Sequence, residues 1–108
     1  MKKKILICGS AGFIGRNTAE AFAADGSFEV YGTWFRSKPP ENSGIKLIRA
    51  DLTNKDDVSK AVEGKDIVIQ AAATTSGANE IMSKPYYHVT DNAVMNALIF
   101  RSAFEHKV

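Results

Sequence analysis

The sequence predicts an α/β domain in which four parallel strands, in the order 3-2-1-4, form one sheet with helices on both faces. Two features support this fold class: short apolar runs alternate with segments of helical periodicity, and a glycine-rich turn directly follows the first apolar run. Parallel strands joined through helices require right-handed crossovers, which place helices on both faces of the sheet. The strand order reverses between the first and fourth strands, so a ligand is expected over the carboxyl ends of the strands there.

The strands are expected where apolar, β-branched and aromatic residues cluster. They are predicted at residues 5–8, 28–33 or 34, 45–50 and 66–72. Between the second and third strands, the polar segment 37–44 is rich in proline, serine and glycine and is expected to form a loop with little or no helix. A second loop is expected from Thr74 to about Pro85.

The first helix is predicted from residue 12 or 13 to residue 24. An Asp-Gly pair at 25–26 ends it, since glycine readily adopts the left-handed conformation that closes a helix. Residues at helical spacing are expected to share its buried face: Ile14, Thr18, Ala21 and Phe22.

The second helix is short and is predicted to begin at a capping box formed by Thr53 and Asp56. Gly64 is expected to end it. Its apolar face is expected to carry Val58, Ala61 and Val62. A third, long helix is predicted at 87–105.

The composition is that of one small domain. The chain has 108 residues, enough for one small core. Its net charge of +2 is too small to indicate a nucleic-acid partner. The lysine run 2–4 is interpreted as a solvated segment that leads into the first strand. No apolar run is long enough for a signal peptide or a membrane span.

The single cysteine, Cys8, excludes an internal disulfide and a cysteine-based zinc cluster, and is expected to be a small core residue. The two histidines, His88 and His106, are too isolated to indicate a metal site. These features favour a cytoplasmic protein.

The segment from Gly9 to Gly15 has the glycine spacing of a dinucleotide-binding turn. Gly9 permits a tight turn after the strand, Gly12 lets the backbone approach the phosphates, and Gly15 lets the helix lie close to the strand. The first N–H groups of the helix lack intrahelical acceptors and lie at its positive end, where they favour an anion. We interpret the segment as a pyrophosphate site; the alternative is a bare strand–turn–helix connection.

The residues after the second strand bear on which dinucleotide binds. In an NAD site, an acidic residue about 20 positions past the turn binds the ribose 2′-hydroxyl. Here Arg36 takes that position, Lys38 follows it, and Glu29 lies too early in the strand to reach the ribose. A guanidinium can hold a 2′-phosphate through two hydrogen bonds and stack on adenine. We therefore expect NADP(H) rather than NAD(H); the alternative is a solvated arginine and lysine at the start of a loop.

Two further segments fit the same ligand. Asp51 follows the third strand and would lie near the adenine amino group, with Leu52 against the ring. Alternatively, Asp51 serves only the turn at Thr53. The alanines Ala71, Ala72 and Ala73, at the end of the fourth strand, are too small to obstruct a ribose, although small residues there could equally reflect helix packing.

Together these motifs resemble the N-terminal part of an extended short-chain dehydrogenase/reductase of the NAD-dependent epimerase/dehydratase branch. The matching pieces are the runs 9–15, 50–53 and 71–73, and Asn92 in the long helix. The resemblance covers the whole chain, which would be about the first third of a usual member. It implies a Rossmann-like fold and nicotinamide-dependent redox chemistry, commonly epimerisation, dehydration or reduction of nucleotide sugars. It also implies that cofactor contacts come from Gly9, Gly12, Phe13, Ile14 and Gly15.

The chain departs from the family at the catalytic residues. The family's acid/base is the tyrosine of a Tyr-x-x-x-Lys pair, whose lysine lowers the tyrosine's pKa so that it exchanges a proton near neutrality. None of Tyr31, Tyr86 and Tyr87 has a lysine four positions later. We therefore expect a cofactor-binding part of a longer enzyme, with no catalytic residues and no activity on its own.

Two features are expected of an incomplete unit. The fourth strand would form an exposed apolar edge of the sheet, which soluble proteins avoid. The helix at 87–105 is apolar around most of its circumference, so that it needs cover on two sides. One side would meet the sheet and the other a second copy, since the family often dimerises through this helix. Two hypotheses remain: the cofactor-binding part of an NADP-dependent oxidoreductase or sugar-nucleotide epimerase, and a non-catalytic NADP(H)-sensing regulatory module.

Overall fold

The structure is a computed structural model that describes residues 2–73 and 86–108, without the side chains of residues 86–88. The predicted loop from Thr74 to Pro85 therefore lies outside the described residues. One parallel sheet with the strand order β3-β2-β1-β4 forms the centre of the molecule, as the sequence predicts. Its strands are β1 (Lys3–Cys8), β2 (Phe28–Trp34), β3 (Ile45–Arg49) and β4 (Ile67–Gln70).

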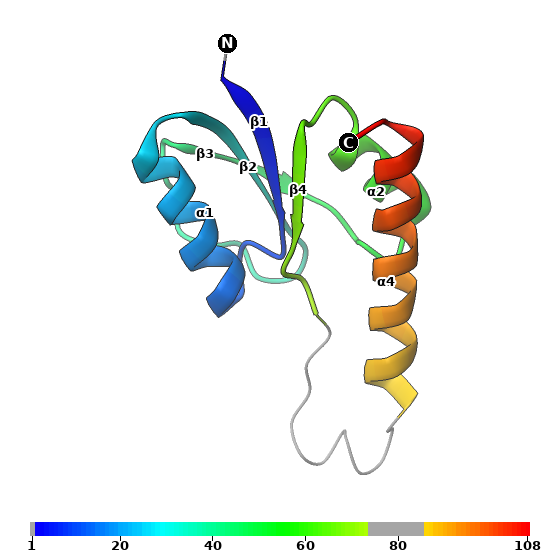
Figure 1. Ribbon diagram of the computed structural model, residues 1–108. Helices are drawn as coiled ribbons and strands as arrows, with labels where there is room; N and C mark the ends of the chain where they lie inside the picture. The colour runs from blue at the N-terminus through cyan, green and yellow to red at the C-terminus, as the bar shows by residue number, and fades with distance from the viewer. Residues whose placement is uncertain (1, 74–85) are drawn as a thin grey trace.

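The described helices cover both faces of the sheet (Figure 1). Helix α1 (Phe13–Asp25) lies against one face, while α2 (Lys55–Val62) and α4 (Tyr86–Glu105) lie side by side against the other. A helix follows β1, β3 and β4, whereas β2 leads to β3 without a helix, and the helices and the sheet form three layers. The fold class predicted from the sequence is confirmed.

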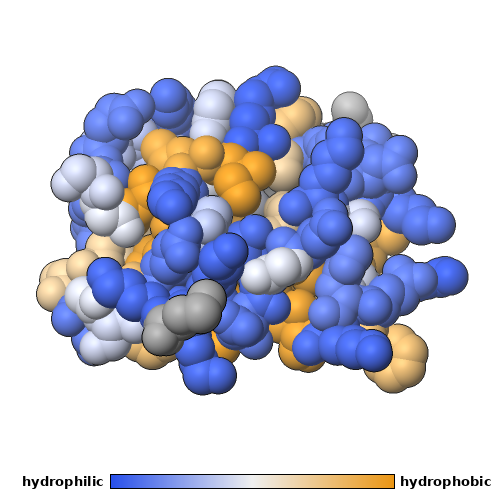
Figure 2. Space-filling view, turned by 90° about the horizontal axis from the view of Figure 1, so that it is seen from above, coloured by the Kyte–Doolittle hydropathy of each residue, from blue (hydrophilic) through white to orange (hydrophobic). Residues whose placement is uncertain are grey.

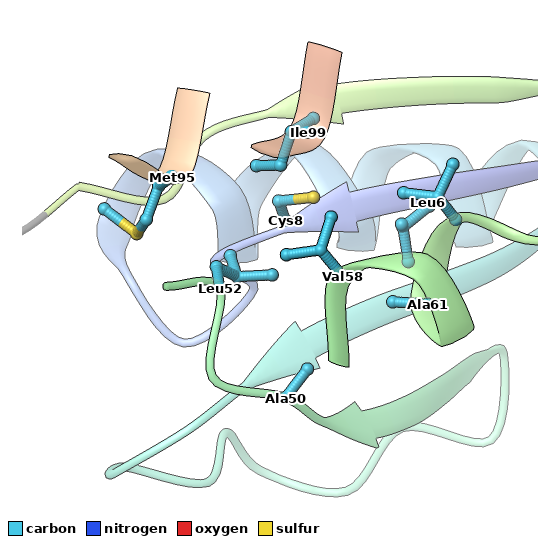
Figure 3. Close-up of a cluster of buried hydrophobic side chains, with 9 residues drawn as sticks. Leu6, Cys8, Ala50, Leu52, Val58, Ala61, Met95 and Ile99 are labelled. Carbon is cyan, nitrogen blue, oxygen red and sulfur yellow. The ribbon is translucent and has the colours of Figure 1, made fainter. Parts of the chain in front are cut away.

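Strand β1 is the centre of the core because its side chains are buried on both faces. Ile5 and Ile7 pack with Ala19 of α1 on one side. Leu6 and Cys8 pack on the other side against α2 and α4 (Figure 3). The Cys8 thiol is fully buried, and burial raises its pKa to about 12. The expectation that Cys8 is a core residue is confirmed.

The buried face of α1 agrees only in part with the predicted one: Phe22 packs against the core and Thr18 is half-buried, as expected. Ile14 and Ala21 are exposed, whereas Gly15 and Ala19 are buried. The reason is the close contact between Gly15 and the turn before the helix: a Cβ on Gly15 would overlap the carbonyl oxygen of Gly9. Backbone packing at a glycine, rather than apolar side-chain spacing, sets the rotation of this helix. Gly26, with φ +79°, ends α1 as predicted.

The start of α2 is also displaced from its prediction. Asn54 is the N-cap residue, and its side-chain oxygen accepts a hydrogen bond from the backbone N–H of Asp57 at 3.0 Å. The predicted cap, Thr53, is engaged elsewhere, since its hydroxyl donates to Asp51 at 2.6 Å. The predicted apolar face of α2 is confirmed, because its three members are each 1% exposed: Val58, Ala61 and Val62.

Four strand boundaries differ from those predicted, including the start of β4, which lies at Ile67 rather than at residue 66. β1 begins two residues earlier, at Lys3, and β3 ends one residue earlier, at Arg49. β4 ends at Gln70 rather than at residue 72. The N–H of Ala71 still donates to the carbonyl oxygen of Cys8 in β1, at 3.0 Å. The N–H of Ala72 no longer pairs with β1 and donates to the side-chain oxygen of Gln70, at 2.9 Å. The partner strand has by then turned away at Gly9, so the ladder cannot continue.

Within the described residues, β4 pairs with β1 alone and forms an edge of the sheet. Helix α4 buries Met95 and Ile99 against the core, and its outer surface exposes large apolar side chains, of which Phe100 is 70% exposed and Phe104 84% exposed. Seen from above, the surface is mostly hydrophilic, with apolar groups gathered between the polar ones (Figure 2). Among the described helices, none combines the length and apolar character that a membrane span requires.

Candidate functional site

A cavity of about 600 Å³ lies at the carboxyl ends of the strands, where the sequence predicts a ligand. This volume falls within the range of small-molecule and cofactor sites. All four strand ends and α4 contribute to its wall. The lining residues are Gly9, Thr33, Trp34, Phe35, Arg36, Ser37, Ala50, Asp51, Leu52, Thr53, Ala72, Ala73, Asp91 and Met95.

The three glycines of the predicted turn have different structural roles. Gly9 has φ +79°, and a Cβ there would lie 2.5 Å from the Cα of Ala72. Gly15 contacts the carbonyl of Gly9 too closely for any side chain. Gly12, in contrast, has an extended backbone (φ −78°, ψ 169°), and its Cβ would lie 3.7 Å from the nearest atom, the carbonyl oxygen of Gly9. The packing of the chain therefore requires glycine at 9 and 15 but leaves room for a side chain at 12.

Strand β2 holds the turn in place through Thr33. The Thr33 hydroxyl oxygen accepts a hydrogen bond from the N–H of Gly9 at 2.9 Å. Its carbonyl oxygen accepts from the N–H of Ser10 at 2.8 Å and from the Ser10 hydroxyl at 2.9 Å. A Cβ on Gly32 would lie 2.6 Å from the Ser10 hydroxyl oxygen, so glycine there makes room for this contact. Thr33 was not among the site residues predicted from the sequence.

The N-terminus of α1 is open to an anion. Gly12 is the N-cap residue, no side chain caps the helix, and no acidic residue lies in its first turn. The first helical hydrogen bond runs from the N–H of Arg16 to the carbonyl of Gly12, so the N–H groups of residues 13–15 precede it. Phe13 and Ile14 are 86% and 70% exposed. Gly12, Phe13, Ile14, Gly15 and Ala71 do not line the cavity wall.

The end of β2 brings cationic and aromatic side chains to the cavity. Arg36 lines it, and the Arg36 guanidinium lies 5.9 Å from the ring centre of Phe35. Glu29 is engaged at the other end of the strand, where it forms an ion pair with Lys46 at 2.6 Å and accepts a hydrogen bond from the Tyr31 hydroxyl at 2.5 Å. These partners lower the pKa of Glu29 to about 2. Glu29 is therefore unsuited to hold a ribose, as the sequence predicts.

Asp51 serves the turn after β3 and also lines the cavity. Its Oδ1 accepts hydrogen bonds from the Thr53 N–H at 3.0 Å and the Thr53 hydroxyl at 2.6 Å. Both bonds use Oδ1, and among the described residues the other carboxylate oxygen, Oδ2, accepts no hydrogen bond. Leu52 is 7% exposed and belongs to the core cluster between the sheet and α4, with one side on the cavity.

The end of β4 is tied to both α4 and β1. The side-chain amide of Gln70 donates to the Asn96 side-chain oxygen at 3.0 Å. The resemblance also implies that Asn92, one turn earlier on α4, braces the backbone of β4, and that role stays a prediction. Ala72 and Ala73 follow on the cavity wall. Of the predicted cofactor contacts, the cavity thus brings together Gly9, Arg36, Asp51, Leu52, Ala72 and Ala73.

Sequence reasoning missed several lining residues. Trp34 and Phe35 directly precede Arg36, so their position at a strand end was a usable signal. Asp91 and Met95 lie one turn apart on α4, and only the packing of that helix on the sheet places them here. Among the residues that the structure describes, there is no group of three histidine, cysteine or acidic side chains that could hold a metal ion.

Known proteins match both the sequence and the fold. The chain is 29% identical over 108 residues to the GDP-L-fucose synthase of Azorhizobium caulinodans, an alignment that covers 98% of this chain and 30% of that protein. A crystal structure of UDP-glucose 4-epimerase superposes with a TM-score of 0.82 at 26% identity, over 98% of this chain and 33% of that one. A variant of uronate dehydrogenase from Agrobacterium tumefaciens, solved in complex with NAD, superposes with a TM-score of 0.79 at 20% identity, over 99% and 38%.

The chain therefore spans about a third of the length of these relatives. The family model described as NAD dependent epimerase/dehydratase matches residues 5–108, which include the glycine turn and every strand end that lines the cavity. By this match, the chain belongs to the NAD dependent epimerase/dehydratase family.

Proposed function

We propose that this chain binds NADP(H) at the carboxyl ends of its strands, as the cofactor-binding part of a nucleotide-sugar epimerase, dehydratase or reductase. One observation carries the proposal: Gly12 lies at an uncapped helix N-terminus, where the packing of the chain leaves room for a side chain. The packing around Gly12 does not require a glycine, so we explain this glycine by a ligand that approaches the backbone closely. The pyrophosphate would take that space.

The rest of the cofactor follows the cavity wall. Arg36 would hold the 2′-phosphate, Asp51 would accept a hydrogen bond from the adenine amino group, and Leu52 would contact the ring. The small side chains of Ala72 and Ala73 would leave room for a ribose. The absence of an acidic residue at the end of β2 supports NADP(H), because a carboxylate there would repel the 2′-phosphate.

The cofactor, when bound, supplies a nicotinamide ring that accepts or donates hydride. The residues of this chain bind and orient it, through backbone N–H groups at the start of α1 and cationic and apolar side chains on the wall. The printed sequence has no Tyr-x-x-x-Lys pair, so we assign the proton transfer and the nucleotide-sugar contacts of the parent enzyme to residues outside these 108. Its relatives are a synthase, an epimerase and a dehydrogenase, which lends no support to a purely regulatory module.

The outer face of α4 supports a homo-oligomer within the same proposal. Val89, Phe100 and Phe104 are each at least 70% exposed, and Val94 is 37% exposed. A second copy of this helix would cover the patch. The variants Phe100→Glu and Phe104→Glu are expected to shift the chain to a monomer in analytical ultracentrifugation, and an unchanged sedimentation coefficient would contradict the oligomer. We also place the protein in the cytoplasm, because its single cysteine leaves no internal disulfide.

Titration calorimetry with NADPH and NADH tests the proposal. The chain is expected to bind NADPH, and Gly12→Val is expected to abolish binding while the far-ultraviolet circular dichroism stays unchanged. Ala21→Val is the control, since Ala21 is exposed on the same helix. Equal NADPH affinity in Gly12→Val and the unmodified chain would overturn the proposed pyrophosphate site.

A further inference from the structure

Two arginines meet at one aromatic ring beside the cavity. The guanidinium carbon of Arg36 lies 5.9 Å from the ring centre of Phe35, and that of Arg49 lies 5.1 Å from the same point. Arg49 also lies 5.8 Å from the ring centre of Trp34. Phe35 and Arg36 line the cavity, whereas Arg49 is not one of its lining residues.

Among the described residues, neither guanidinium group forms an ion pair with a carboxylate. The nearby Lys38 forms an ion pair with Glu41 at 3.2 Å. Two like charges next to one ring repel each other and raise the local positive potential, which favours a multiply charged anion.

The backbone anchors Arg49 more firmly than it does Arg36. Arg49 is the last residue of β3 and pairs in register with Trp34, and the following N–H, that of Ala50, donates to the Trp34 carbonyl at 2.8 Å. Arg36 lies beyond the end of β2. The β3 backbone thus sets where the exposed Arg49 side chain begins, and the Arg49 guanidinium lies within cation–π range of the Phe35 ring, which in turn contacts Arg36.

We propose that Arg49 is a positioning residue for NADP(H) selectivity: it holds Phe35, and through it Arg36, and adds positive potential at the 2′-phosphate. This inference rests on the proposed NADP(H) site. The 2′-phosphate distinguishes NADP(H) from NAD(H), so loss of Arg49 affects the binding of one cofactor and not of the other.

Calorimetry on the full chain with NADPH and with NADH tests this role. Arg49→Gln is expected to weaken NADPH binding about fivefold and to leave NADH affinity unchanged. Arg49→Lys, which keeps the charge, is expected to restore most of the NADPH affinity. Lys60→Gln is the charge-matched control, since Lys60 lies in the last turn of α2 and is expected to have no effect.

A double-mutant cycle that combines Arg49→Gln with Phe35→Leu tests whether Arg49 influences NADPH binding through the Phe35 ring. If Arg49 acts through the ring, Arg49→Gln in the Phe35→Leu background has a smaller effect on NADPH binding than it has alone. An equal effect in both backgrounds would overturn the positioning role.

The remaining outcomes separate this inference from the proposed function. If Arg49→Gln binds NADPH as the unmodified chain does while Arg36→Ala loses selectivity, the Arg49 role is wrong and the proposed function stands. Equal weakening of NADPH and NADH by Arg49→Gln, or equal weakening of NADPH by Lys60→Gln, also overturns it. If the unmodified chain does not prefer NADPH to NADH, the cofactor assignment and the Arg49 role fail together.

Discussion

The hydroxyl oxygen of Thr33 accepts a hydrogen bond from the backbone N–H of Gly9 at 2.9 Å. This bond joins the end of β2 to the turn that leaves β1, and it is formed by a side chain that is 1% exposed. Gly9 has φ +79°, a left-handed conformation that glycine adopts readily, so the position of the turn depends on contacts such as this one. Thr33 thus ties the glycine turn to β2, the strand that leads to Arg36.

Thr33→Val tests this connection. Valine has nearly the same shape but cannot accept the hydrogen bond, so the partly buried N–H of Gly9 loses its partner. The free energy of unfolding in urea is expected to fall by about 1–2 kcal/mol. Thr18→Val is the control, because the Thr18 hydroxyl donates to Ile14 on the surface of α1 and its loss is expected to change stability by less than about 0.5 kcal/mol. Equal stability of Thr33→Val and the unmodified chain would show that this bond is dispensable.

Alanine substitutions at Gly15 and Gly12 are expected to have opposite consequences. A Cβ on Gly15 would overlap the Gly9 carbonyl, so Gly15→Ala is expected to destabilise the fold by about 3 kcal/mol or more. A Cβ on Gly12 has room, so Gly12→Ala is expected to change stability by less than about 1 kcal/mol. Urea denaturation measures both, and a Gly15→Ala variant as stable as Gly12→Ala would contradict the close approach of α1 and β1.

Arg36→Ala tests the choice of cofactor. A charge-assisted, bidentate bond to the 2′-phosphate predicts that NADPH affinity falls about 10- to 100-fold, while NADH affinity is unchanged. Calorimetry with both cofactors measures the ratio. Arg101→Ala is the matched control, because Arg101 pairs with Glu105 on the surface of α4, away from the cavity. Unchanged NADPH affinity in Arg36→Ala would show that the NADP(H) assignment is wrong.

The Glu29 carboxyl is expected to stay ionised well below pH 4.5, down to about pH 2. The hydrogen bond from Lys46, followed by that from Tyr31, lowers its pKa from the ordinary 4.5 to about 2. Because the folded pKa lies below the unfolded one, Glu29 stabilises the fold fully above pH 4.5, and this contribution is lost as the pH falls through about 2. Titration of the side-chain carboxyl by NMR measures the pKa directly.

Lys46→Gln is the matched variant for this titration. Without the lysine, the pKa of Glu29 is expected to return toward its ordinary value, so the loss of stability on acidification begins at a higher pH. Lys60→Gln, on the surface of α2, is expected to leave the titration unchanged. A Glu29 pKa near 4.5 in the unmodified chain would contradict the ion pair.

Cys8 is expected to be unreactive in the folded chain. Its thiol is buried in the core next to α2 and α4, and burial raises its pKa to about 12, so almost no thiolate is present at pH 8. Alkylation by iodoacetamide at pH 8 is expected only in urea, with mass spectrometry as the readout. Rapid alkylation in buffer would show that the core at the end of β1 opens.

Much of the fold could be predicted from the sequence because it depends on local chemistry. The first apolar run specifies β1, and the glycines after it specify the turn. The helical pattern that follows specifies α1, which an Asp-Gly pair ends. Right-handed crossovers then leave few sheet orders, and the observed order β3-β2-β1-β4 is the predicted one. Arg36 and Asp51 could be placed at the cavity because each lies two residues past the end of a strand, and parallel strands end at the same edge of the sheet.

The errors arose where tertiary contacts override local patterns. Apolar spacing predicted that Ile14 faces the core, but the contact between Gly15 and the Gly9 carbonyl rotates α1 away from that face. Thr53 has the right residue type for an N-cap, yet its bond to Asp51 leaves the cap to Asn54. In both cases the deciding partner lies outside the helix whose pattern was analysed.

The sequence by itself determined the α/β class, the strand order and the glycine turn, because hydrophobic periodicity and glycine spacing act over neighbouring residues. Only the tertiary structure decided which side chains share the cavity. Thr33 reaches Gly9 from another strand, Asp91 reaches the wall from a distant helix, and Arg49 reaches Phe35 across the sheet. Such contacts depend on how separate elements pack, and no spacing within one segment encodes them.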